Sequence, residues 1–194
     1  MRAGTTEKLA LARAPLVLPR YPHSVTVPEG GLGRVVHDRP ELSICEIHEL
    51  MVIVYRRPIT GDGLAAVSAA QRRIHQAHGK VAGLSVLSAQ ALERPDPALR
   101  AAGQTVSDEF DQIAYASAIV LDKSGMQGAF YRSVLTGIHL ASRRPVQQRV
   151  FSELLEAIEW IVSKNAESPL TSRTLEVRRR IEALLRAGEE AKRS

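Results

Sequence analysis

Four histidines are the side chains of this sequence best suited to binding a metal. His75 and His78 lie three residues apart, which places them on one side of a helix, and a metal would need a further ligand such as His48 or His139. The H-E-x-x-H spacing of zinc-binding catalytic helices is absent from the sequence. Because the end of a helix favours positive charge, surface histidines explain the pair more simply. We therefore predict no metal and no cofactor.

Three further residues could contact an anion or a partner: Arg132 carries a fork of donors, and Ser133 and Thr136 lie beside it in a helical pattern. The simpler interpretation is a solvated helix flank. The single cysteine, Cys45, alternates with apolar residues as a small hydrophobe in a strand would. The sequence has no G-x-S-x-G or G-x-G-x-x-G motif and no paired carboxylates at a catalytic spacing. We predict no catalytic residues and no enzyme.

The first elements that would position these residues are a hairpin, a helix and a strand. Residues 43–48 alternate in hydrophobicity, whereas residues 51–56 are apolar at successive positions, as in a strand covered on both faces. A helix follows the turn at residues 60–63, with Thr60 or Asp62 as its N-cap, and ends at Gly79. Its polar face is predicted to hold Gln71, Arg72, Arg73 and Gln76. Residues 80–87 then form a parallel strand.

The second half of the pattern alternates helices with strands. Asp96 caps a helix with Pro97 at its first position, and the apolar stripe of this helix runs to Ser117. A central strand at residues 118–121, a helix from residue 127 to 141, a short strand at 149–151 and a closing helix capped by Ser152 complete the domain. The predicted fold is α/β: a small mixed sheet, opened by a hairpin and continued by parallel crossovers, with amphipathic helices packed on it.

Two flanking segments differ in composition from this predicted domain at residues 41–164. Residues 1–40 contain five prolines and are interpreted as a Pro/Gly-rich arm, with edge strands at residues 25–27 and 34–36. Residues 165–194 predict a charged helix that begins at Thr171 or Ser172. Its apolar stripe is narrow, so we expect it to pack on the domain, on a partner, or on its counterpart in a homodimer.

Charge and hydrophobicity restrict the classes of partner. The net charge of +5 belongs to the ends of the chain, because residues 41–164 carry thirteen Lys/Arg and thirteen Asp/Glu. A protein that binds nucleic acid needs a basic face, and nothing in the composition of this neutral core indicates one. Nucleic acid is therefore not the expected partner. No apolar run approaches the ~18–20 residues that span a bilayer, and residues 1–20 lack the apolar stretch of a signal peptide. With one cysteine, these features predict a soluble, cytoplasmic protein.

The order of elements and several residues resemble the STAS-like proteins of the SpoIIAA-like type, whose fold is similar to the CRAL-TRIO lipid-binding domain. The resemblance covers about residues 43–164 and rests on residues 118–121, 132–138, 150–151 and 156–161. It implies regulation through protein–protein contacts, or the binding of an apolar ligand. A regulatory serine follows an aspartate in one branch of these proteins. Here Ser88 is its counterpart by position only, because no aspartate precedes it.

Two functions follow as expectations. The first is a non-enzymatic regulatory or scaffold module that binds a protein partner through the exposed sheet edge or a groove between helices. The alternative is a carrier or sensor of a small apolar ligand held between helices and sheet. A carrier would need an enclosed apolar cavity of at least ~300 Å³.

Overall fold

The computed structural model describes residues 32–92, 96–121 and 146–190. Residues 1–31 of the predicted arm, including the strand expected at 25–27, lie outside these ranges, as does the predicted helix 127–141 with Arg132, Ser133, Thr136 and His139. The described elements are β1 (Arg34–Asp38), β2 (Leu42–Ile47), β3 (Leu50–Tyr55), α1 (Gly61–His78), β4 (Val81–Leu87), the 3-10 helix η1 (Ala89–Leu92), α2 (Pro97–Ile113), β5 (Ala114–Leu121), β6 (Gln147–Phe151), α4 (Leu154–Ser163) and α5 (Thr174–Glu190).

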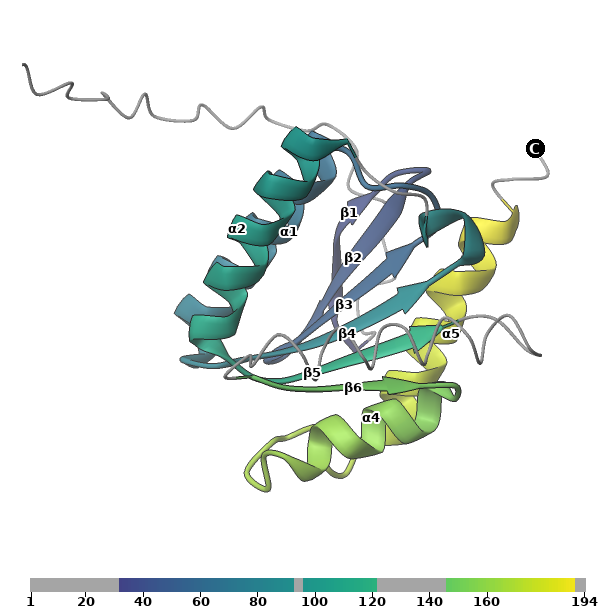
Figure 1. The fold of residues 1–194 in the computed structure, drawn as a ribbon. Coiled ribbons are helices and arrows are strands. Elements are labelled where there is room, and N and C mark those ends of the chain that lie inside the picture. Colours follow the sequence, from purple (N-terminus) through teal and green to yellow (C-terminus); the bar gives the residue numbers. More distant parts are fainter. Residues whose placement is uncertain (1–31, 93–95, 122–145, 191–194) are drawn as a thin grey trace, which may run out of the picture.

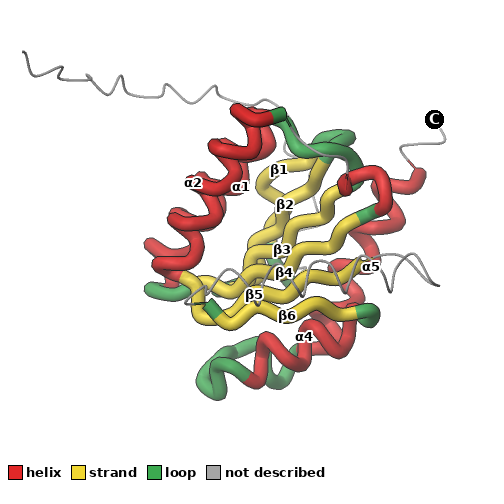
Figure 2. The backbone as a smooth tube through the Cα atoms, viewed as in Figure 1, coloured by secondary structure: helices red, strands yellow, loops and turns green. Residues whose placement is uncertain are grey.

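The six strands form one mixed sheet in the order β1-β2-β3-β4-β5-β6 (Figure 1). β1, β2 and β3 are antiparallel neighbours, and β3, β4, β5 and β6 run parallel. Helices α1 and α2 lie on one side of the sheet, and α4 and α5 lie on the other, so the domain has three layers (Figure 2). The predicted α/β fold, with a hairpin followed by parallel strands, is confirmed.

The three central strands pair as the apolar runs predict. Val52 in β3 lies opposite Leu84 in β4, and Val120 in β5 lies opposite Val86, two residues further along β4. All four side chains belong to the same buried cluster. The parallel ladder is therefore the centre of the fold.

β2 is covered on both faces although its sequence alternates in hydrophobicity, and every residue of Leu42–Ile47 except Glu46 is buried. The strand lies between β1 and β3 and is covered on both faces. Ile44 packs with residues of α1, and Cys45 packs with residues of α5. β1, which forms the outer neighbour, contains the edge strand expected at residues 34–36, so the sheet begins within the predicted arm.

The predicted helix caps are present in α1 and α2. The Thr60 hydroxyl accepts a hydrogen bond from the backbone N–H of Gly63 at 3.1 Å, and Gly79 ends α1 with a left-handed φ of 70°. The Asp96 carboxylate accepts from the backbone N–H of Leu99 at 2.8 Å, with Pro97 in the first turn. These local interactions fix where both helices begin.

Three predicted boundaries are wrong. α2 ends at Ile113, so Ser117 lies in β5, which is longer than the predicted strand 118–121. α4 follows Glu153, which makes no side-chain capping bond, instead of being capped by Ser152. α5 begins at Thr174, after the predicted starts. At the end of α2 the apolar pattern runs across the true boundary into β5, whereas the starts of α4 and α5 were misplaced because a serine or threonine was taken as the N-cap.

Two apolar layers cover the two faces of the sheet. The layer beneath α1 and α2 is the smaller. The layer beneath α4 and α5 includes the central strand residues together with Ala157, Ile158, Ile161, Val162, Leu170, Val177, Ile181 and Leu184. Both faces of the parallel strands are thus removed from water, as parallel sheets require.

The apolar stripe of α5 packs on the sheet of its own chain. Val177, Ile181 and Leu184 are buried there, whereas Leu175 is 59% exposed. Of the three packing modes expected for this helix, packing on the domain accounts for the stripe. A homodimer through α5 stays a prediction, and within the described ranges it would have to use other residues of this helix, such as Leu175.

Gly83 determines how closely α2 approaches the sheet. A Cβ atom at this position of β4 would lie 2.7 Å from Cζ of Phe110, which is closer than real carbon atoms approach. The absence of a side chain therefore lets the Phe110 ring lie directly on β4. The contact anchors a helix of which no residue is fully buried.

We predict that Gly83→Ala lowers the free energy of unfolding by about 1–3 kcal/mol, because the new methyl group overpacks the Phe110 ring. In a Phe110→Leu background the same change should cost at least ~1 kcal/mol less. Urea denaturation of the four proteins measures this coupling. Gly61→Ala is the matched control, because a Cβ atom at that position meets nothing within 4 Å. Equal costs in both backgrounds would refute the contact.

Candidate functional site

Ser88, the positional counterpart of a regulatory serine, lies just beyond the end of β4 and is half-buried. Its hydroxyl donates to the backbone carbonyl of Arg56 at 2.8 Å, and its backbone N–H donates to the carbonyl of Tyr55 at 2.9 Å. Both bonds tie the chain after β4 to the end of β3. The side chain thus has a structural role in this conformation, and a regulatory role stays a prediction.

The histidines considered for a metal site are only partly brought together. His48 occupies the tight turn between β2 and β3 with a φ of 51°, a conformation that two-residue hairpin turns require. Its ring centroid lies 6.2 Å from that of His78 in an edge-to-face arrangement. The described residues contain no group of three His, Cys, Asp or Glu side chains that could hold a metal ion.

Cys45 is fully buried in the layer beneath α5. Burial raises the pKa of its thiol, and the nearby Arg180 charge opposes this effect. The thiol is therefore protonated and shielded, and its packing fits the predicted small hydrophobe.

A buried carboxylate ties the amino ends of the parallel strands to the loop between α4 and α5. Glu49 is 3% exposed. It accepts hydrogen bonds from the Ser168 hydroxyl and, at 3.3 Å, from the Asn165 side-chain amide. Asn165 accepts in turn from Lys80 at 2.9 Å. Burial, and next the charge of Glu49, raise the pKa of the neighbouring Tyr115 to about 12. We call Glu49, Lys80, Asn165 and Ser168 the Glu49 cluster.

A buried arginine also joins separate elements of the fold, just beyond the end of β3. Arg56 is 8% exposed. Its guanidinium donates to the backbone carbonyls of Arg39 at 3.1 Å and Leu184 at 3.3 Å, and lies 3.5 Å from the carboxylate of Asp38. Arg56 therefore joins β3, the turn after β1 and α5.

The two edge strands of the sheet differ in how they are protected. β1 is interrupted by a bulge between Val35 and His37. Glu46 on the adjacent strand forms ion pairs with Arg34 at 2.9 Å and with Arg73 at 2.7 Å. Bulges and charges are devices that discourage pairing with another chain. β6 pairs with β5 in an unbroken register, and within the described ranges no strand pairs with its other side.

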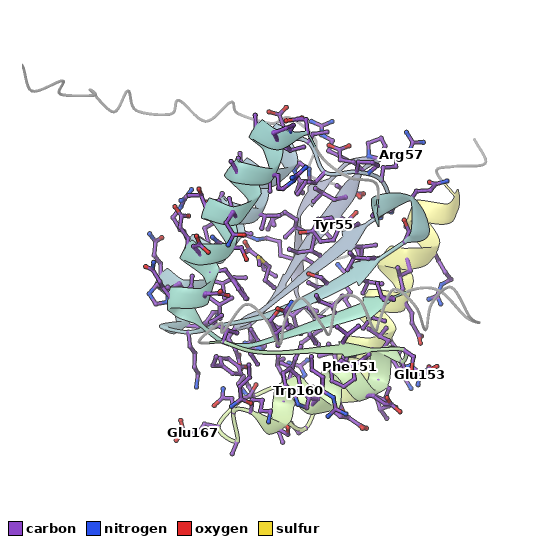
Figure 3. The ribbon with its side chains drawn as sticks, in the orientation of Figure 1. Tyr55, Arg57, Phe151, Glu153, Trp160 and Glu167 are labelled. Atoms are coloured by element: carbon purple, nitrogen blue, oxygen red, sulfur yellow. The ribbon has the colours of Figure 1, made fainter. Side chains whose placement is uncertain are left out.

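Aromatic and cationic side chains gather beside β6. The ring centroids of Phe151 and Trp160 lie 5.6 Å apart. The guanidinium of Arg149 lies 5.1 Å from the centroid of Phe151, and the ammonium of Lys164 lies 5.2 Å from that of Trp160. Figure 3 shows Phe151 and Trp160 together where β6 meets α4. We call these four residues the β6 edge surface, of which Arg149 and Lys164 are exposed.

A pocket of about 180 Å³ lies between the sheet and helices α1 and α2. Its walls are mixed: apolar side chains come from the strands and both helices, and polar groups come from serines and glutamines. The lining residues are Met51, Ile53, Tyr55, Leu64, Val67, Gln71, Gly83, Ser85, Gly103, Val106, Ser107, Phe110, Ser117, Ile119 and Gln148. The volume is below the ~300 Å³ that a carrier of a drug-sized ligand needs.

Gln71 is the residue of this pocket that the sequence interpretation placed wrongly. It was assigned to the polar, solvated face of α1, but it is only 1% exposed. Its amide donates to the backbone carbonyl of Val106 at 3.3 Å and so joins α1 to α2. The sequence does hold a signal for this burial, because Gln71 lies seven residues after Leu64 and three before Ile74, which places it within the apolar stripe of the helix.

Comparison of the chain with protein-family models, with curated proteins and with solved structures found no match in any of the three. The structure therefore identifies an α/β domain whose six-stranded mixed sheet begins with an antiparallel hairpin, and no family. Among the described residues, none of the helices is both long and apolar enough to cross a membrane.

We predict that Ser168→Ala lowers the free energy of unfolding by about 1–3 kcal/mol, because it leaves the buried Glu49 carboxylate with fewer donors. Thermal or urea denaturation measures the loss. The exposed Ser172→Ala is the matched control and should change stability by less than about 0.5 kcal/mol. If both variants are equally stable, the Glu49 cluster does not hold the α4–α5 loop.

The buried phenol of Tyr55 predicts a loss of stability in alkali. Burial raises its pKa to about 12, compared with about 10 in an unfolded chain. The folded protein thus holds this proton more tightly, and the resulting stability is complete below pH 10 and is lost as the pH rises toward 12. Between about pH 9 and pH 11.5, the free energy of unfolding measured by urea denaturation should fall by about 1–2 kcal/mol more in the wild type than in Tyr55→Phe. Parallel declines would contradict the prediction.

Proposed function

We propose that this protein is a non-enzymatic regulatory or scaffold module that binds another protein through the β6 edge surface. The observation that carries the proposal is the Phe151–Trp160 pair, flanked by Arg149 and Lys164, next to β6, whose outer side pairs with no other strand of the described ranges. Tryptophan and arginine are the residue types that most often dominate binding energy at protein interfaces. An edge strand offers backbone donors and acceptors to an extended partner segment.

The arrangement of the polar residues supports a non-enzymatic role. The Glu49 carboxylate accepts from Ser168 and Asn165, and the Arg56 guanidinium holds two backbone carbonyls and faces Asp38. These charges are occupied by contacts that join elements of the fold. General acid–base catalysis needs a group that faces a substrate in a cleft.

The resemblance to STAS-like proteins of the SpoIIAA-like type supports the same proposal, because that class implies regulation by protein contacts. The mixed sheet with an opening hairpin and parallel crossovers agrees with this architecture at the level of the fold. The partner that we propose is a protein with an extended segment, which adds a strand beside β6 and places an apolar side chain against Trp160.

A second candidate function is the sensing of a small ligand, which the pocket beneath α1 and α2 favours. Its volume of about 180 Å³ restricts the ligand to a molecule much smaller than a lipid.

The edge proposal is tested by affinity capture under native conditions with quantitative mass spectrometry. The amount of a partner protein that is recovered should be at least about tenfold lower with Trp160→Ala than with the wild type. Truncation of a central interface tryptophan lowers the binding free energy by about 2 kcal/mol or more. Arg149→Ala, at an exposed position, should also weaken recovery. Circular dichroism confirms that both variants are folded.

Leu175→Ala is the control, since it removes the exposed large hydrophobic residue of α5, on a different element from the β6 edge surface. Recovery that is unchanged in Trp160→Ala and Arg149→Ala but lost in Leu175→Ala would move the interface to α5 and refute the edge proposal. A wild type that recovers no protein above an empty matrix would refute it as well.

A further inference from the structure

The central residue of the edge strand β6 is a cation. β6 consists of Gln147–Phe151, and Arg149 is the middle one of these five residues. Its side chain is exposed, and none of the ion pairs within the described ranges includes it. Its guanidinium lies 5.1 Å from the centroid of the Phe151 ring. The guanidinium therefore has no carboxylate partner in this part of the chain, although a carboxylate is the group that matches it best.

The central position of Arg149 makes a second copy of the chain a poor occupant of this edge. If two copies of β6 paired antiparallel over their full length, Arg149 would lie directly opposite its counterpart. Like charges in that arrangement destabilise a sheet, and a charge on an edge strand discourages self-association. A different protein with a carboxylate at the facing position would form an attractive pair instead. Charge complementarity thus favours a partner with an acidic residue.

The residue two positions along β6 sets a second requirement on the partner. Side chains alternate along a strand, so Arg149 and Phe151 belong to the same face of the sheet. Phe151 is part of the buried layer beneath α4 and α5, and the half-buried Trp160 packs on it with a centroid distance of 5.6 Å. A partner side chain opposite Phe151 would lie beside the Trp160 ring, where an apolar group buries the most surface.

The sign of the charge changes just past the carboxyl end of β6. Glu153 is exposed, has an extended backbone with a φ of −118° and a ψ of 133°, and makes no side-chain capping bond to α4. Figure 3 shows it next to Phe151, where β6 leads into α4. A partner carboxylate at this end would be repelled by Glu153. The edge therefore favours one acidic residue at a defined place over an acidic run.

We infer that the segment that adds to β6 carries an acidic side chain opposite Arg149 and an apolar side chain two residues away, opposite Phe151. The inference rests on the proposed function, for which it names the chemistry of the partner. The apolar contact with Trp160 provides affinity, and the charged pair selects among extended segments and fixes their register on the strand.

Peptides test this pattern while the partner is unidentified. The immobilised full chain is used to select from a phage-displayed library of random linear peptides, and enriched peptides are synthesised and titrated by fluorescence anisotropy. They should share an Asp or Glu two residues from an apolar residue. Their affinity for Arg149→Glu should be about tenfold lower than for the wild type, because an attractive pair becomes a repulsive one. Peptides with Lys in place of the acidic residue should recover this loss on Arg149→Glu.

Arg179→Glu is the matched control, because it reverses an exposed arginine of α5, and it should leave peptide binding unchanged. Equal binding of the peptides to the wild type and to Arg149→Glu overturns the inference, as does a library that yields no peptide above the empty matrix. A wild-type dimer in sedimentation that dissociates in Trp160→Ala also overturns it, since a second copy would then occupy the edge.

The two proposals fail in different ways. Loss of peptide binding in Trp160→Ala but not in Arg149→Glu would refute the charged pair and leave the proposed function standing. Binding that neither variant changes would place the peptides on another surface and count against both proposals.

Discussion

The fold depends on the requirement that a parallel sheet be covered on both faces. β3, β4 and β5 present apolar side chains at successive positions, and Val52, Leu84 and Val86 are almost fully buried. One helical layer cannot cover both faces, so the chain needs α1 and α2 on one side and α4 and α5 on the other. This is why α5, although rich in charge, belongs to the core.

The two helical layers bury their own residues against the sheet to different extents. On the α4–α5 side, Ile158, Ile161 and Ile181 are fully buried against the strands. On the other side, α2 has no fully buried residue and approaches the sheet through Phe110 on Gly83. The described pocket lies on this side, between the sheet and helices α1 and α2.

Interactions within a few residues could be predicted from the sequence, and interactions across the fold could not. Thr60, Gly79 and Asp96 act on their own helix ends, so their roles follow from residue type and position. Uninterrupted apolar runs likewise identified the central strands. The hydrogen bond of Gln71 joins it to Val106 of another helix, and the pairing of Glu49 with Ser168 joins residues far apart in the sequence. No local pattern encodes these contacts. The boundary between α2 and β5 was missed because an amphipathic helix runs directly into a strand that continues its apolar pattern.

The contacts of the buried charges restrict where the proposed binding can occur. In open α/β sheets, ligands usually bind beyond the carboxyl ends of the parallel strands. Here Arg56 follows the carboxyl end of β3 and is held by Asp38 and two backbone carbonyls, while the amino ends are joined to the α4–α5 loop by the Glu49 cluster. A buried charge released from such contacts costs several kcal/mol, so these residues cannot readily turn to a ligand. Trp160 is only partly buried, beside the exposed Arg149 and Lys164, so the proposed binding at the β6 edge surface would not release either buried charge from its contacts.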